Sequence, residues 1–300
     1  MESSIWYEKY APKTLEEEIL PPKVKEKFLK YLKDEKMPNL GFWSSKPGLG
    51  KSSTARAIIK SMNADAMFIN SSLERGIDVL RTKIMSFASQ ESLMDRPKIV
   101  VMDECDNIGK DAQAGFRSFL DEFSKNCSFI FTGNYKSKII EPLLDRLENY
   151  DFEDFDPKDM GKPIFDKLLY ILKNEKVELN DDTINGVKTI VKNCYPCIRS
   201  MIGSLQRSVI NGKFEYVAES SNFNEILEVL KTKDYLTLVQ KVNTLNNPDS
   251  MYEFLYRNIN VFKNVPQAIC FIADGQFKTE TVRDKNLNLC ATLVNLSNCL

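Results

Sequence analysis

Between residues 40 and 152, short apolar runs alternate with longer stretches in which apolar residues recur every three or four positions. The short runs are typical of buried strands, and the longer spacing is typical of helices with one buried face. We therefore predict strands at 40–44, 66–70, 98–102, 128–132 and 149–152, with helices at 51–62, 77–87, 111–123 and 139–144. This alternation predicts an α/β fold with a mostly parallel sheet that helices cover on both faces.

The strand pattern stops after residue 152. The acidic stretch 153–157 ends in a proline and is typical of a linker. Helical spacing returns at 164–173, 183–192 and 198–210 and, after a break at Asn211 and Gly212, from about residue 220 to residue 300. We predict an α/β domain at 1–153, a small helical domain at 154–218 and an all-helical domain at 219–300. A chain of 300 residues is long enough for more than one core.

Composition removes several classes of chemistry. The 41 basic and 42 acidic residues nearly cancel, so any binding to nucleic acid must come from a few local cations. The chain has no histidine, which excludes Ser-His-Asp catalysis and zinc sites with imidazole ligands. No signal peptide or apolar run of about 18 residues is present. We therefore predict a cytoplasmic protein (host cytoplasm if viral) with no membrane partner, whose seven cysteines are reduced.

A glycine-rich loop between the first predicted strand and helix gives the clearest chemical signal. Its glycines would let backbone N–H groups turn onto phosphate oxygens at the start of a helix. Lys51 would reach the β- and γ-phosphates, and the hydroxyl of Ser52 would bind Mg²⁺. We predict that ATP binds to Ser45, Lys46, Pro47, Gly48, Leu49, Gly50, Lys51, Ser52 and Ser53, a match to G-x-x-x-x-G-K-[ST] in which Ser45 replaces the first glycine. That replacement is tolerated if position 45 needs no positive φ.

Polar residues follow two more predicted strands. Asp103 and Glu104 come directly after 98–102, and Asn134 follows 128–132. An acidic pair after a strand is commonly just a solvated turn, but parallel strands end at the edge of the sheet where ligands bind. Beside a phosphate-binding loop, Asp103 would hold Mg²⁺ and Glu104 would polarise the attacking water. Asn134 could orient that water or sense the γ-phosphate.

Several segments together resemble replication factor C-type clamp loaders. These are Trp-Tyr-Glu-Lys-Tyr-Ala-Pro-Lys-Thr-Leu at 6–15, the stretch from asparagine to arginine at 70–81, 111–117, and Ile-Ile-Glu-Pro-Leu at 139–143. The resemblance runs from about residue 6 to residue 206. The short chain and Ser45 are more similar to the large clamp-loader subunit of T-even-like bacteriophages than to cellular subunits. The resemblance implies a P-loop AAA+ module, a three-helix lid and a helical collar for oligomerisation.

The resemblance also implies roles around the nucleotide. Tyr10 and Pro12 would lie near the adenine. Asn134 would be the first sensor of the nucleotide, and Arg199 would be the second, reaching its own subunit's site from the lid. Ala11 stands where many relatives carry arginine.

Three further residues would act outside the subunit's own nucleotide site. Arg146 would be the arginine finger that completes the site of a neighbouring subunit. It lies between Asp145 and Leu147 where relatives carry Ser-Arg-Cys, and Asp145 could hold its guanidinium within the subunit. Gln113 would couple neighbouring subunits, and Arg81 would face DNA in a central channel.

The sequence therefore predicts an ATP hydrolase with Mg²⁺ as cofactor. Its partners would be a sliding clamp, primer–template DNA and other clamp-loader subunits, in a ring of identical ATPase subunits with one different subunit. Two other functions stay open: a nucleotide-binding structural subunit that does not hydrolyse ATP, and another DNA-acting AAA+ motor. Glu104 argues against the first, and the resemblance at 70–81 and Gln113 argues against the second. Cys194 and Cys197 have C-x-x-C spacing, but packing explains them better than metal because no second pair lies at ligand spacing.

Overall fold

A five-stranded parallel sheet organises the first part of the chain. The computed structural model describes residues 4–34, 36–72, 77–90, 96–124, 126–215, 219–243, 245, 248–279 and 281–300. The strands lie in the order β2-β3-β4-β1-β5, and their pairings are all parallel. They are β1 (Leu40–Trp43), β2 (Asp65–Asn70), β3 (Lys98–Asp103), β4 (Ser128–Gly133) and β5 (Glu148–Asp151). The predicted parallel sheet is confirmed, with each strand end within one residue of its expected place.

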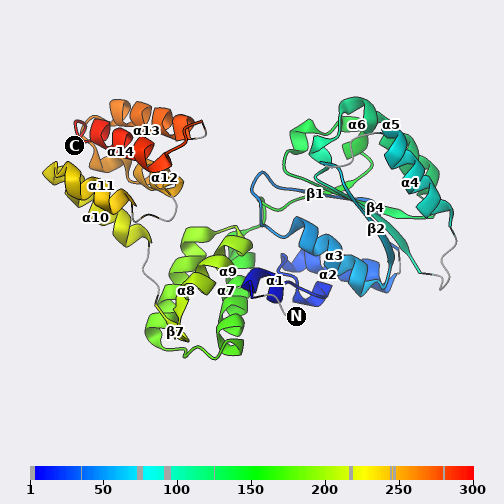
Figure 1. The fold of residues 1–300 in the computed structure, drawn as a ribbon. Helices are drawn as coiled ribbons and strands as arrows, with labels where there is room; N and C mark the ends of the chain where they lie inside the picture. The colour runs from blue at the N-terminus through cyan, green and yellow to red at the C-terminus, as the bar shows by residue number, and fades with distance from the viewer. Residues whose placement is uncertain are drawn as a thin grey trace. The chain divides into compact units, whose positions relative to one another are not determined.

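Helices cover both faces of this sheet (Figure 1). Side chains along a strand point to alternate faces, so Phe129 and Phe131 join one apolar cluster and Ile130 joins the other. The first face packs against α4 (Ile77–Ser89), α5 (Lys110–Phe123) and α6 (Glu141–Leu144). The second packs against α2 (Pro22–Lys33) and α3 (Lys51–Ser61). Because both faces are covered, the strands are continuously apolar, as the sequence indicates.

Three helices follow the sheet: α7 (Pro157–Asn174), α8 (Asp181–Cys194) and α9 (Ile198–Arg207). The side chain of Asp156 caps α7 by accepting from the backbone N–H of Lys158, and Pro157 takes the first helical position. The amino-terminal helix α1 (Trp6–Lys9) contacts α9 through a hydrogen bond from the backbone N–H of Trp6 to Gln206 Oε1, at 2.9 Å. The amino-terminal segment is therefore attached to the helices that follow the sheet.

The expected helix at 198–210 is wrong at its end. The chain leaves α9 and forms a small antiparallel hairpin of β6 (Val209–Ile210) and β7 (Lys213–Phe214). Asn211 and Gly212 connect the strands with φ angles of 51° and 76°. Asn-Gly is the pair that favours a two-residue hairpin turn, because both positions need positive φ. The same pair that marks a break in helical spacing thus also reverses the chain.

The chain divides into two compact units, 1–215 and 216–300. In the second unit, every regular element of the described part is a helix. These are α10 (Glu219–Thr232), α11 (Tyr235–Asn243), α12 (Asp249–Arg257), α13 (Val265–Thr279) and α14 (Lys285–Leu296). Gly275 lets α13 approach its neighbours, since a Cβ there would lie 2.3 Å from Thr292 Oγ1 and 2.7 Å from the ring of Tyr252. The division of the first unit near residue 153 stays a prediction.

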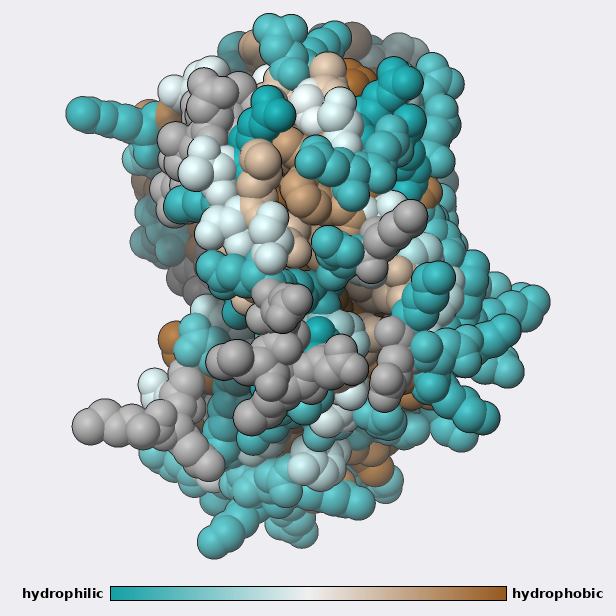
Figure 2. All heavy atoms as spheres, turned by 90° about the vertical axis from the view of Figure 1, so that its right-hand side faces the viewer, coloured by the Kyte–Doolittle hydropathy of each residue, from teal (hydrophilic) through white to brown (hydrophobic). Residues whose placement is uncertain are grey.

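Short 3₁₀ helices complete the structure at Leu15–Glu17, Cys105–Asn107, Lys136–Lys138 and Ile259–Val261. Hydrophilic residues dominate the visible surface on one side of the molecule (Figure 2), because the large apolar side chains of the sheet and its helices are buried. Within the described residues, no helix combines the length and the hydropathy that crossing a membrane requires.

Candidate nucleotide-binding site

A cavity of about 780 Å³ lies where the carboxyl ends of β3 and β4 meet the start of α3. Ligands of open α/β sheets bind at such strand ends. The lining comes from the loop before α3, from two strand ends, from the amino-terminal segment and from α9. Among the predicted site residues, it includes Tyr10, Pro12, Pro47, Gly48, Gly50, Lys51, Ser52, Ser53, Asp103, Glu104, Asn134 and Arg199.

The loop before α3 requires glycine at two positions. Gly48 and Gly50 have φ angles of 80° and 104°, in the region that side chains disfavour. A Cβ on Gly48 would also lie 2.8 Å from Cys197 Sγ, so the position lacks room for one. Ser45 is not among the described residues with positive φ. The condition under which serine can replace the first glycine is therefore met.

A carboxylate that follows the neighbouring strand β5 holds the start of this loop. Glu153 accepts hydrogen bonds from the backbone N–H and the hydroxyl of Ser45 and from the backbone N–H of Lys46. The bond from the Ser45 hydroxyl is the main reason that the pKa of Glu153 lies below its usual value. The sequence pattern places Glu153 in a linker, so this role was not predicted. Ser45 supplies a hydroxyl donor that glycine would lack, and Glu153 accepts its hydrogen bond.

Lys51 is a buried cation aimed at the same edge. Its side chain is 9% exposed, and its Nζ donates to Asn134 Oδ1 at 3.0 Å and to the carbonyl oxygen of Ser44 at 3.1 Å. Burial lowers the pKa of Lys51, while the charges of Asp106 and Asp103 oppose that shift. A buried ammonium group gains much from an anion because it has little water around it. The site is thus suited to a phosphate group.

Asp103 and Ser52 form a pair of oxygen ligands. Asp103 Oδ1 accepts from Ser52 Oγ at 3.0 Å and also from the hydroxyl of Thr132. A carboxylate beside a hydroxyl is the kind of donor set that Mg²⁺ takes when phosphate supplies further oxygens. These residues therefore fit the predicted Mg²⁺, with Asp103 and Ser52 as its protein ligands.

Glu104 and Asn134 are positioned by their backbones. Glu104 is exposed to the cavity and has φ 55° and ψ 39°, a left-handed conformation that costs a non-glycine residue of order 1–3 kcal/mol. Such strain is most often kept at functional sites. The backbone N–H of Asn134 donates to Asp106 Oδ1 at 3.1 Å, which fixes the turn after β4. Asp106 was not predicted, although it lies only two residues after Glu104.

The amino-terminal segment and the helices after the sheet close the other side of the cavity. The hydroxyl of Tyr10 donates to Glu175 Oε1 at 2.6 Å, and its partial burial raises the pKa of Tyr10 to about 12. The backbone N–H of Arg199 donates to the carbonyl oxygen of Gly48 at 3.3 Å. Its guanidinium lies 5.5 Å from the ring centroid of Tyr7. Tyr10 and Arg199 both line the cavity, and their roles near the adenine and as second sensor stay predictions.

One cysteine of the C-x-x-C pair, Cys197, contacts the phosphate-binding loop. Cys197 Sγ donates to the carbonyl oxygen of Pro47 at 3.2 Å, and the hydroxyl of Ser200 donates to Cys197 Sγ at 3.0 Å. The described residues contain no cluster of three or more His, Cys, Asp or Glu residues that could hold a metal ion. Cys197 therefore joins α9 to the phosphate-binding loop.

Gln113 links two segments of the first unit. Its side chain is 1% exposed, and its Nε2 donates to the carbonyl oxygens of Ile108 at 2.8 Å and Lys138 at 3.1 Å. Its Oε1 accepts from the backbone N–H of Ile140 at 2.8 Å. Ile108 follows the acidic strand end, and Ile140 precedes α6. Gln113 thus connects the acidic end of β3 to the helix that leads to Arg146.

Arg146 and Arg81 lie outside the cavity. Arg146 makes a two-pronged contact with Asp121, from Nε to Oδ1 at 2.9 Å and from NH2 to Oδ2 at 3.0 Å, and its NH1 donates to the carbonyl oxygen of Pro142. Asp121, rather than the neighbouring Asp145, is its partner. Arg81 is exposed on α4, with its guanidinium 5.7 Å from the ring centroid of Phe119. Within the stretch 70–81 that resembles clamp loaders, residues 73–76 lie outside the described residues.

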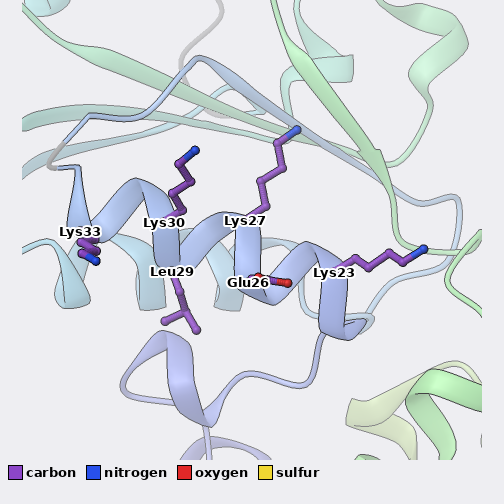
Figure 3. A pocket seen from close by; sticks show the side chains of 6 residues that line it. All are labelled: Lys23, Glu26, Lys27, Leu29, Lys30 and Lys33. Atoms are coloured by element: carbon purple, nitrogen blue, oxygen red, sulfur yellow. The ribbon is translucent and has the colours of Figure 1, made fainter.

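A second hollow, of about 500 Å³, lies along α2 (Figure 3). Its lining comes from a single helix: Lys23, Glu26, Lys27, Leu29, Lys30 and Lys33. Lys27 already pairs with Glu148. Polar groups from different elements do not converge here as they do around Lys51. We therefore assign the chemistry to the cavity at the strand ends.

Comparison with known proteins places the chain in a family. Residues 43–153 match the family described as "ATPase family associated with various cellular activities (AAA)". The sliding-clamp-loader large subunits of Escherichia phage RB69 and Enterobacteria phage T4 are 33% and 35% identical over 237 residues, which is 76% of this chain and 73% of each relative. A replication factor C small subunit of Saccharolobus solfataricus is 34% identical over 224 residues, 73% of this chain and 66% of that protein. The chain therefore belongs to the family of clamp-loader and replication factor C subunits, which are ATPases of the AAA type.

Proposed function

We propose that this chain is an ATP-hydrolysing subunit of a DNA sliding-clamp loader. The observation that carries the proposal is the convergence of Lys51, Asp103, Glu104 and Asn134 on one cavity, in a chain of this family. A nucleotide-binding subunit that did not hydrolyse ATP would have no use for a carboxylate held at that edge by a strained backbone. Glu104 therefore favours hydrolysis over a purely structural role.

The reaction is the transfer of the γ-phosphoryl group of ATP to water. Lys51 and the backbone N–H groups of the loop bind the phosphates, and Ser52 and Asp103 hold Mg²⁺, which supplies positive charge against the phosphate oxygens. Glu104 accepts the proton of the attacking water, and Asn134 orients that water. Catalysis then comes from positioning and charge rather than from a covalent intermediate.

The subunit works in an assembly in this proposal. ATP binding drives the opening of a sliding clamp and the binding of primer–template DNA, and hydrolysis releases the closed clamp on the DNA. Arg146 completes the site of a neighbouring identical subunit, Gln113 transmits the state of one site to the next, and Arg81 contacts DNA phosphates. A different, additional subunit completes the ring.

A clamp-stimulated ATPase assay tests the proposal. We expect hydrolysis by the assembled complex to rise when the sliding clamp of the same source and primed DNA are added together. The native mass in the presence of an ATP analogue gives the assembly in the same preparation. A DNA-stimulated activity that ignores the clamp would instead indicate another DNA-acting motor, and nucleotide binding with no turnover would indicate a structural subunit.

A further inference from the structure

A buried carboxylate lies in the nucleotide cavity and has no part in the phosphate chemistry. Glu18 lines the cavity in the segment between the 3₁₀ helix Leu15–Glu17 and α2, and its residue is only 5% exposed. Its carboxylate accepts a hydrogen bond from the hydroxyl of Ser53, in the first turn of α3. Burying a charged carboxylate is costly unless its remaining acceptor sites are satisfied.

The surroundings of Glu18 do not neutralise it. Within the described residues, no cation lies within ion-pair distance of its carboxylate. Lys25 is near, but its Nζ donates to the backbone carbonyl oxygens of Glu16 and Glu18 instead. Lys167, which lines the same cavity, also lowers the pKa of Glu18 through its charge, without forming an ion pair with it. Burial raises the pKa of Glu18 to about 7, and the hydrogen bond from Ser53 only partly opposes this shift.

The position of Glu18 points to the nucleoside half of the ligand. The phosphates belong at the loop that runs from Gly48 to Ser52. Apart from that loop, the cavity is also lined by aromatic and apolar side chains, which suit a planar base: Tyr7, Tyr10, Pro12, Ile19 and Ile202. Glu18 precedes Ile19 in the chain and accepts a hydrogen bond from Ser53, so it adjoins both the apolar lining and the end of the phosphate-binding loop.

We propose that Glu18 selects adenine by accepting a hydrogen bond from the exocyclic amino group of the base. Adenine presents a donor at its 6-position, whereas guanine and hypoxanthine present a carbonyl oxygen there, which a carboxylate repels. The inference rests on the proposed binding of ATP and deepens it. A hydrogen bond to a charged group is worth roughly 10- to 150-fold in affinity, and an unpaired buried carboxylate adds to the penalty for the wrong base.

Nucleotide analogues separate this contact from every other one. At pH 8, above the raised pKa of Glu18, we would measure dissociation constants of the full chain for ATP, inosine triphosphate, purine riboside triphosphate and 2′-deoxy-ATP, in the wild type, Glu18→Gln and Glu18→Ala. The wild type should prefer ATP over the inosine and purine riboside analogues by at least roughly 10-fold. Glu18→Ala should lose that preference. Glu18→Gln should bind inosine triphosphate better than the wild type, because an amide can donate to the carbonyl oxygen. Glu16→Gln, an exposed neighbour, is the matched control.

The ratio of two affinities in one preparation does not depend on the fraction of folded protein, so a poorly folding variant cannot imitate the result. Equal preference for ATP in the wild type and in both Glu18 variants would overturn the role of Glu18 and leave ATP binding intact. A second result would also overturn it: the wild type prefers ATP over 2′-deoxy-ATP, and Glu18→Ala loses that preference. Glu18 would then accept its hydrogen bond from the ribose 2′-hydroxyl and not from the base. Absence of any nucleotide binding by the wild type would overturn the proposed function together with this inference.

Discussion

Charged groups have different partners in the nucleotide cavity and at the surface site formed by Arg146, Asp121 and Pro142. In the cavity, Lys51 bonds to an amide and to carbonyl oxygens, and Glu104 stays exposed. At the other site, Arg146 makes three hydrogen bonds to Asp121 and Pro142 of its own chain. The first arrangement leaves charge to be neutralised by a ligand, whereas the second is already neutral. In the proposed function, a subunit would therefore bind nucleotide alone, whereas a neighbouring subunit would have to compete with Asp121 for Arg146.

Replacing Arg146 tests this difference most strongly. A finger supplied across a subunit boundary is worth on the order of 10³–10⁵ in rate. Arg146→Ala should therefore suppress hydrolysis in the assembly by about that factor and leave the nucleotide affinity of the isolated subunit nearly unchanged. Mixing Arg146→Ala chains with Glu104→Gln chains should restore some turnover, since an intact Glu104 then faces an intact Arg146. If normal assemblies of the mixture stay inactive, Arg146 does not act across the boundary.

The cavity itself should separate binding from chemistry. Lys51→Ala should remove nucleotide binding, because the buried cation faces the phosphates in the ground state. Glu104→Gln should keep binding and slow hydrolysis by roughly 10²- to 10⁴-fold, the usual contribution of a general base. Equilibrium titration beside single-turnover hydrolysis distinguishes the two. Unchanged turnover in Glu104→Gln would remove this residue from the role of base.

Glu18 should make the cavity sensitive to pH. Its pKa rises from 4.5 to about 7 on folding, so the folded state keeps a proton that the unfolded state has lost between these values. Stability from this group is present below pH 4.5 and is lost as the pH rises through 7. The free energy of unfolding of Glu18→Gln minus that of the wild type should thus be about 3 kcal/mol larger at pH 8 than at pH 4.5. Urea unfolding at both pH values measures this, with Glu16→Gln as control, and an equal difference at both values would contradict it.

A smaller effect is expected from releasing the arginine. Asp121→Asn removes the charge that holds Arg146 but keeps the shape of the side chain. Exposed ion pairs are weak, so assembled turnover should rise by only roughly a few-fold, with no change in the isolated subunit. A fall in turnover would show that Asp121 holds Arg146 in its working position instead.

Arg81 gives the smallest expected change. It also lies against α5, but it contacts a ring rather than a carboxylate, so its charge stays available. Arg81→Ala should reduce the slope of log affinity for DNA against log salt by about one, uniformly across sequences. Lys83→Ala, an exposed position two residues later, is a suitable comparison. An unaltered slope would leave Arg81 as a surface residue.

The sequence predicts well what depends on local pattern. Buried parallel strands give continuous apolar runs, and Lys51, Asp103 and Asn134 follow strand ends, so both the sheet and the convergence of these residues could be foreseen. The hydrogen bonds by which Glu153 holds the loop could not be foreseen, because Ser45 and Glu153 lie 108 residues apart and no spacing rule relates them. The hairpin after α9 was missed for a different reason: Asn-Gly marks both a helix break and a tight turn, and only the paired strands distinguish them.

The amide of Gln113 has a consequence for ionic conditions. It makes three hydrogen bonds to backbone groups and carries no charge, so salt does not screen it. The contact of Arg146 with Asp121 is an exposed ion pair and weakens as salt is added. Rising ionic strength should therefore loosen the arginine while the link between the acidic strand end and α6 stays intact. The hydrogen bonds of Gln113 thus do not depend on ionic strength, whereas the ion pair between Arg146 and Asp121 does.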